Sequence, residues 1–272
     1  MSNLPFEEFC LPMDGTEFPV IRFGTGERNL LILMGMSLHG ITGQGAAMAQ
    51  KFRLFADDYT VTVLDRKKLL PEGTTIRDMA EDVFHAAAML GIGSADVYGI
   101  SQGGMIAQIY AAEHPEAVHA LVLCATAYHV SPEMRETVST WIRLADAGDV
   151  TALNMDCFGR IFSPTLLKKY EKALKVLAGR GSIEECRRFA TLGRTCMDFN
   201  TEAMLNNIRC PVLVIAGEED RVLGAEDSRV LARQTGGQLL MIPGYGHSVY
   251  DEAPDVKERI YEFLSCHIYK YL

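Results

Sequence analysis

Residues 95–113 have the sequence ADVYGISQGGMIAQIYAAE, in which a strand, a tight turn and a helix follow one another directly. Residues 95–98 predict a strand, and residues 105–113 predict an Ala-rich helix. Gly99-Ile100-Ser101-Gln102-Gly103 lies between them. A serine on such a turn takes a strained backbone that lifts its Oγ above the sheet, and the N–H groups of the following helix point at a reacting carbonyl. Ser101 is therefore the candidate nucleophile.

The alternation of strand and helix continues on both sides of this stretch. Apolar or β-branched runs predict further strands at 19–23, 29–34, 59–64, 119–124, 211–216 and 238–242. Helical spacing of Ala, Leu and Met predicts helices at 46–55 and 76–90, and we expect further helices at 225–234 and about 255–269. Repeated strand–helix–strand units join parallel strands by right-handed crossovers. The sequence therefore predicts an α/β fold with a mostly parallel central sheet flanked by helices.

The pattern changes between residues 130 and 205. Helix-like segments at 132–147, 150–161, 164–178 and 183–192 follow one another there without a convincing strand. The segment is larger than a connecting loop should be. We therefore expect a core formed by residues 1–129 and 206–272, interrupted by a helical insertion at 130–205.

A serine hydroxyl is a poor nucleophile unless a base takes its proton. His247 lies in the glycine-rich Gly244-Tyr245-Gly246-His247-Ser248, which follows the strand 238–242, so its ring can reach across the edge of the sheet. The histidines at 85, 114, 119 and 267 lie in or beside predicted helices and strands, where a structural role explains them better. His247 is the candidate base.

The base needs a carboxylate to orient it. Asp220 follows the strand 211–216 through Gly217-Glu218-Glu219; Glu218, Glu219 and Asp227 are the alternatives. What favours Asp220 is the chain order of serine, acid and histidine, each after a separate strand.

At this point the sequence resembles the α/β-hydrolase family along nearly its whole length, in the stretches LLILMG, YTVTVLDR, DVYGISQGG, PVLVIAGEEDRVLG and GYGHSVYDEAP. The resemblance implies a catalytic triad of Ser101, His247 and Asp220, with the insertion at 130–205 forming a helical cap. It also implies an oxyanion hole made by the backbone N–H groups of Gln102 and Met36. The chain is similar to esterase-like and enol-lactonase-like members.

The chain departs from the family at two places. Many relatives carry His-Gly where this chain has Met34-Gly35, and a shifted alignment would use His39-Gly40 instead. The glycine-containing loop that is common after Asp65-Arg66 is replaced by Lys67-Lys68-Leu69-Leu70-Pro71. We prefer Met36 as the second donor because it directly follows the strand, and we leave one wall of the site undefined.

These residues predict a serine hydrolase that cleaves a small, partly apolar carboxylic ester, lactone or thioester through an acyl-enzyme on Ser101. The same residues also serve carbon–carbon bond hydrolysis, perhydrolysis or a low-turnover ligand receptor. Most apolar side chains of the insertion are expected to pack it rather than to touch substrate, and Arg143 and Arg194 are candidates for binding a substrate carboxylate. No metal or organic cofactor is expected, because such a triad needs none and no His, Asp or Cys cluster has ligand spacing.

Composition excludes several classes of partner. The formal net charge of −9 argues against nucleic acid, and we expect the short basic runs 66–68 and 168–169 to be solvated. No apolar stretch is long enough to span a bilayer, and the N-terminus lacks the pattern of a secretory signal. Seven scattered cysteines without CxxC spacing suit free thiols in a cytoplasmic protein, which we expect to be a monomer or homodimer that acts on a small molecule.

Overall fold

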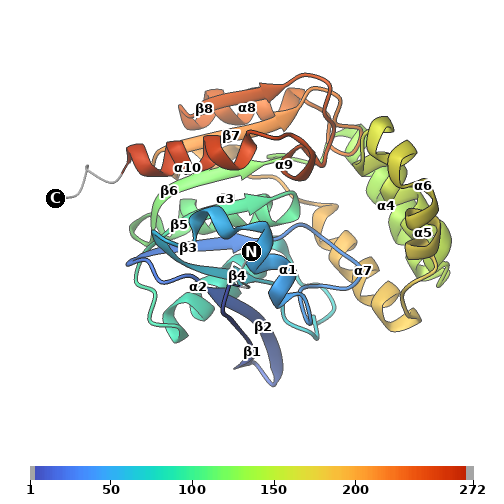
Figure 1. Ribbon diagram of the computed structural model, residues 1–272, viewed down its shortest axis with the longest axis horizontal. Coiled ribbons are helices and arrows are strands. Elements are labelled where there is room, and N and C mark those ends of the chain that lie inside the picture. Colours follow the sequence, from blue (N-terminus) through green and yellow to red (C-terminus); the bar gives the residue numbers. More distant parts are fainter. Residues whose placement is uncertain (1–3, 268–272) are drawn as a thin grey trace.

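The structure is a computed structural model that describes residues 4–267, and it is built around one eight-stranded sheet (Figure 1). The strand order is β1-β2-β4-β3-β5-β6-β7-β8; β1 and β2 are antiparallel to their neighbours, and all later pairs are parallel. The strands are β1 (Phe6–Met13), β2 (Thr16–Phe23), β3 (Arg28–Leu33), β4 (Tyr59–Leu64), β5 (Ala95–Ile100), β6 (Val118–Cys124), β7 (Val212–Gly217) and β8 (Gln238–Ile242). The predicted fold class is confirmed.

The sequence analysis missed β1, which forms a hairpin with β2. Asp14 and Gly15 connect the two strands with φ of 50° and 75°, as expected for a two-residue turn whose twist matches that of the strands. An Asp-Gly pair between two runs of alternating apolar residues is a known hairpin signal. The antiparallel pair extends one edge of the parallel sheet.

Helices cover both faces of the sheet, and a further group belongs to the chain segment that connects β6 to β7. They are α1 (Gly45–Lys51), α2 (Ile76–Met89), α3 (Gln102–Glu113), α4 (Pro132–Asp146), α5 (Val150–Ile161), α6 (Pro164–Ala178), α7 (Ile183–Cys196), α8 (Glu226–Thr235), α9 (Val249–Glu252) and α10 (Val256–Cys266). The predicted helix 46–55 is divided at Phe52 into α1 and a 3₁₀ turn. Residues 268 and 269 of the predicted last helix lie outside the described residues.

Alternate side chains of the central strands enter two different cores. In β3, Leu31 and Leu33 pack among residues of α2 and α3, whereas Leu30 and Ile32 pack among residues of α1 and α10. Successive residues of a strand point to opposite faces, so a strand covered by helices on both sides must be apolar throughout. This explains the unbroken apolar run that predicted β3.

The expectation that residues 66–68 are solvated is wrong for two of the three. Arg66 and Lys67 are buried. Lys67 Nζ lies 2.9 Å from Asp82 Oδ1 and 2.9 Å from Asp14 Oδ2, so α2 and the β1–β2 turn neutralise its charge. A buried ammonium is tolerated only with such partners, and both of them are distant in sequence.

Helices α4–α7 gather at one side of the molecule, on the right in Figure 1, away from α10. The two ends of this segment are joined, because the Thr201 N–H donates to the Tyr128 carbonyl at 2.8 Å and His129 pairs with Asn200 as an isolated bridge. Helix α7 runs four residues beyond the predicted end at 192, and this extra turn contacts the core through Thr195 and Cys196. No helix within residues 4–267 is long and apolar enough to cross a membrane.

We predict that Leu31→Ala lowers the free energy of unfolding by about 2–5 kcal/mol, because it leaves a cavity where the wild-type side chain is fully buried. Urea unfolding followed by circular dichroism measures the change. Leu69→Ala is the control, since Leu69 is 71% exposed and its loss should cost less than about 0.5 kcal/mol. Equal losses in the two variants would contradict the described core.

Candidate active site

Ser101 occupies the turn between β5 and α3 in a backbone conformation that is rare for a residue with a side chain. Its φ is 54° and its ψ is −121°. Cys124 at the end of β6 and Thr126 two residues later hold this conformation. The Ser101 N–H donates to the Cys124 carbonyl at 2.9 Å, and Thr126 Oγ1 donates to the Ser101 carbonyl at 2.8 Å. Strain of this kind persists only where the surroundings enforce it, and it is concentrated at functional sites.

The two glycines that flank Ser101 permit the helix to approach the strand ends closely. A side-chain carbon at Gly103 would lie 2.0 Å from the Leu33 carbonyl oxygen, and one at Gly99 would lie 2.7 Å from the Gly103 carbonyl oxygen. Neither contact is tolerable, so any other residue would push α3 away from β3 and β5. The pentapeptide pattern around Ser101 is thus a packing requirement of the turn.

The structure brings the three side chains of the sequence analysis together. His247 Nε2 lies 3.0 Å from Ser101 Oγ, and His247 Nδ1 lies 2.9 Å from Asp220 Oδ2. His247 and Asp220 are buried, whereas Ser101 is half-buried. With Nδ1 donating to the carboxylate, Nε2 can accept the proton of the serine hydroxyl.

Backbone groups complete the surroundings of Asp220. Its Oδ1 accepts hydrogen bonds from the Val222 N–H at 2.8 Å and the Leu223 N–H at 3.1 Å. Burial by itself raises the pKa of this carboxyl, but the facing His247 ring and the two N–H donors outweigh burial and hold the pKa below its ordinary value. Asp220 therefore faces the imidazole as a carboxylate.

The loops that carry Asp220 and His247 are bonded to each other. The Glu219 N–H donates to the Tyr245 carbonyl at 2.9 Å, which fixes the distance between the acid and the base. Of the alternative acids, Glu218 and Glu219 are exposed, and Asp227 lies 3.4 Å from His129 instead. The structure places only Asp220 of these four against His247.

The segment after β3 and the residue after Ser101 carry the two N–H groups that are predicted to bind an oxyanion. A side-chain carbon at Gly35 would be 3.2 Å from Ser101 Cβ, so the segment after β3 passes directly against the serine. Neither the Met36 N–H nor the Gln102 N–H donates a hydrogen bond to another of the described residues. The alternative pair lies elsewhere: His39 bonds Glu185, and Gly40 lies against Asp65.

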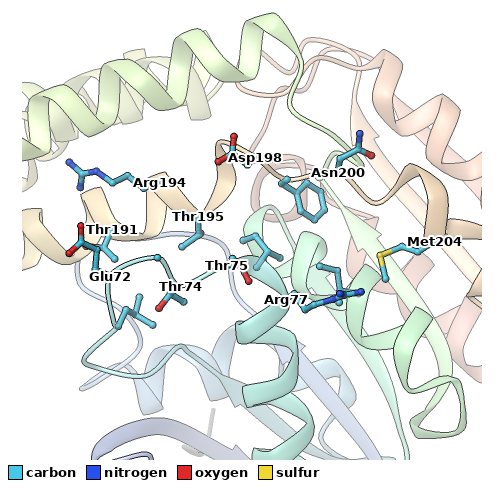
Figure 2. A pocket seen from close by; sticks show the side chains of 15 residues that line it. Glu72, Thr74, Thr75, Arg77, Thr191, Arg194, Thr195, Asp198, Asn200 and Met204 are labelled. Carbon is cyan, nitrogen blue, oxygen red and sulfur yellow. The ribbon is translucent and has the colours of Figure 1, made fainter.

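A cavity of about 1080 Å³ opens between the loop before α2 and helix α7 (Figure 2). None of Ser101, His247 and Asp220 lines it, so its size alone does not make it the reaction site. Arg194 does line this cavity, where both of its contacts run to Asp146 oxygens at 2.6 and 2.7 Å. The Arg194 guanidinium is thus paired with a carboxylate, at a cavity that Ser101 does not line.

Several large apolar side chains of residues 130–205 pack into the core cluster. Met134, Trp141, Phe189 and Phe199 are buried in the core cluster, and Met155 is exposed. Arg143 is exposed on α4. All seven cysteines are free thiols, and residues 4–267 contain no cluster of three or more His, Cys, Asp or Glu side chains that could hold a metal ion.

Sequence reasoning missed two residues that support the site. Thr126 holds the Ser101 carbonyl, and its signal was its place two residues after a parallel strand, at the edge where functional side chains gather. Glu252 accepts hydrogen bonds from Ser163 and from Ser248, next to His247. No local sequence pattern predicts the role of Glu252, because its partner Ser163 is distant in sequence.

A family model for serine aminopeptidases of family S33 matches residues 73–254, which is more than half of the chain. Among curated proteins, the chain is 29% identical over 212 residues to "Putative carbamate hydrolase RutD" of Klebsiella pneumoniae, covering 75% of this chain and 78% of that protein. It is 28% identical over 191 residues to a monoacylglycerol lipase of Mycolicibacterium smegmatis, covering 65% of this chain and 66% of that protein.

Solved structures share the fold. An α/β hydrolase enzyme from a Medee basin deep-sea metagenome library superposes with a TM-score of 0.83 at 20% identity, covering 94% of this chain and 97% of that one. The enol-lactonase from Burkholderia xenovorans LB400 superposes with a TM-score of 0.81 at 21% identity, covering 94% and 99%. At such identities the likeness concerns the fold alone.

We predict that the difference in free energy of unfolding between the wild type and Asp220→Asn changes in favour of Asp220→Asn as the pH falls below about 5. The folded-state pKa of Asp220 is lowered, so the carboxylate contributes stability that is present above its unfolded value of about 3.9 and is lost as the pH falls through the folded value. Urea unfolding at several pH values measures the difference. The exposed Asp57→Asn is the control for loss of one carboxylate, and a difference that widens with acid would contradict the prediction.

Proposed function

The chain belongs to the serine aminopeptidase S33 family of α/β-hydrolase enzymes, and from this premise we propose that it is a serine hydrolase of small carboxylic esters or related acyl compounds. The observation that carries the proposal is the continuous hydrogen-bonded line from Ser101 Oγ through His247 to Asp220, with distances of 3.0 and 2.9 Å. The strained turn supports it, since a serine without a function would gain nothing from that conformation.

In the proposed mechanism, His247 Nε2 takes the hydroxyl proton while Ser101 Oγ attacks the substrate carbonyl carbon. Asp220 keeps the Nδ1 proton in place and stabilises the imidazolium that forms. His247 then gives its proton to the leaving group, which departs and leaves an acyl-enzyme on Ser101. A water molecule, deprotonated by the same nitrogen, releases the acid and restores the serine.

The negative charge of each tetrahedral intermediate falls on the former carbonyl oxygen. We assign its stabilisation to the Met36 and Gln102 N–H groups, which are unpaired within the described part of the chain and belong to the segment against Ser101 and to the residue after it. Preorganised donors of this kind contribute about 3 kcal/mol each to the transition state. Gln102 is also the first residue of α3, so the helix dipole acts in the same direction.

We further propose that residues 130–205 form a cap over the site. Helix α7 meets the residue after the nucleophile, since Gln102 Nε2 donates to the Leu192 carbonyl at 2.9 Å. The end of α5 meets the residue after the base, since the Ser248 N–H donates to the Ile161 carbonyl at 3.1 Å. The inserted helices therefore border both catalytic loops, and their apolar side chains favour a partly apolar substrate.

The class of acyl compound follows the relatives. A protein named a carbamate hydrolase and a protein named a monoacylglycerol lipase are similar to this chain over about two thirds of its length or more. Ester and carbamate carbonyls react by the same acyl transfer, and a lactone is a cyclic ester. We propose esters as the first substrates to test and carbamates, lactones and thioesters as the second.

We predict that a fluorophosphonate probe labels the wild type and that the protein hydrolyses short p-nitrophenyl esters. Ser101→Ala should abolish labelling and lower kcat by at least about a thousandfold, because a triad acts as a unit. The exposed Ser139→Ala is the control for the loss of one hydroxyl group, and it should behave as wild type in both assays.

Two results would overturn the proposal. Absence of labelling, together with turnover that Ser101→Ala leaves unchanged, would exclude Ser101 as the nucleophile. Labelling with negligible turnover of every ester, carbamate, lactone and thioester, but with a ligand-induced rise in Tm, would indicate a ligand receptor on the same fold.

A further inference from the structure

Arg66 is buried beneath the candidate site and joins the two backbone segments that flank Ser101. The residue is 3% exposed. Its Nη1 donates to the Gly35 carbonyl at 3.2 Å, and its Nη2 donates to Gln102 Oε1 at 2.7 Å. One guanidinium thus contacts the segment after β3 and the first residue of α3. These segments are not neighbours in sequence, and among the described residues no other side chain bonds both.

The bond to Gly35 determines where the Met36 N–H points. The carbonyl of Gly35 and the N–H of Met36 belong to one peptide group, and the described chain contains no cis peptide bond. In a trans peptide group these two bonds point in opposite directions. A guanidinium that holds the carbonyl on one side therefore presents the N–H on the other side.

Resting on the proposed function, we propose that Arg66 is a positioning residue that orients the oxyanion-binding N–H groups of Met36 and Gln102. It fixes the Gly35–Met36 peptide plane through the carbonyl, and it fixes the side chain of Gln102 at the start of α3. Arg66 does not touch the reacting atoms.

The charge of Arg66 also strengthens the donor that it orients. Hydrogen bonds in series polarise one another, so a cation bonded to the Gly35 carbonyl makes the Met36 N–H a better donor. The charge is compensated rather than free, since Arg66 Nη1 lies 3.6 Å from Asp65 Oδ1. Arg188 shares that carboxylate, with its Nη2 3.3 Å from Asp65 Oδ1.

The geometry calls for arginine in particular. A guanidinium has donors on a rigid, planar fork and can serve two acceptors in fixed directions, whereas an ammonium is a single point of charge. Lysine at this position would keep the charge but hold only one of the two acceptors well. Arg66→Lys should therefore be intermediate between wild type and Arg66→Met.

The test compares Arg66→Met with Arg188→Met. Both variants remove one cation that contacts Asp65, but only the first frees the Gly35 carbonyl and the Gln102 side chain. For a p-nitrophenyl ester we expect Arg66→Met to lower kcat by about 10- to 100-fold with KM changed less than about twofold, somewhat less than complete loss of an oxyanion donor. Arg188→Met should keep kcat within about threefold of wild type.

A trifluoromethyl ketone separates positioning from general damage. The hydroxyl of an active serine adds to its carbonyl carbon, and the former carbonyl oxygen becomes an oxyanion that needs the same two N–H groups. Its inhibition constant should rise in Arg66→Met by the same factor by which kcat/KM falls. The same proportionality between the two quantities should hold in Arg66→Lys. A variant that is merely less stable shows a lower Tm without this proportionality.

The outcomes are distinguishable from those of the proposed function. If the wild type neither reacts with fluorophosphonate nor hydrolyses acyl substrates, both proposals fail. If the wild type is active but Arg66→Met and Arg188→Met lose activity equally, or if the ketone binds Arg66→Met as tightly as wild type, only the role of Arg66 fails. Should Arg66→Met not fold, the same comparison of kcat/KM with ketone affinity in Arg66→Lys decides, and unchanged values there overturn the proposal.

Discussion

The backbone of Ser101 is the constraint on which the rest of the site depends. A residue with a side chain pays of order 1–3 kcal/mol for φ of 54° and ψ of −121°, and a free peptide would relax out of it. Three separate contacts prevent relaxation: Cys124 and Thr126 bond its N–H and its carbonyl, and Gly103 lets α3 sit against β3. The position of the hydroxyl is therefore a property of several strands rather than of the turn alone.

The other two residues of the hydrogen-bonded line from Ser101 also lie at this edge of the sheet. Asp220 and His247 follow neighbouring strands, β7 and β8, and the bond from the Glu219 N–H to the Tyr245 carbonyl ties their loops. Parallel strands place the ends of successive units side by side, so residues 146 positions apart can meet. Arg66 follows a fourth strand, β4, and contacts Gln102, the residue after Ser101.

Sequence patterns predicted the elements and the meeting of Ser101, Asp220 and His247, because strand period, glycine placement and chain order are local or ordinal signals. They failed where burial depends on distant partners. Arg66 and Lys67 form part of a basic run that is typical of a solvated surface, yet both are buried. Arg66 bonds Gln102 and Lys67 bonds Asp82, and neither partner is close in sequence. The strand β1 was missed although Asp14-Gly15 marks its hairpin, because its exposed residues weaken the alternation.

The bond between Thr201 and Tyr128 has an evolutionary consequence. It makes the segment between β6 and β7 a detour that leaves the core and returns to the same point. Changes of length or sequence inside such a detour are absorbed without moving either strand, as at other surface positions where chain ends lie close together. Sequence changes in those parts of the segment that contact neither Gln102 nor Ser248 can therefore accumulate without displacing the strand ends that carry the site.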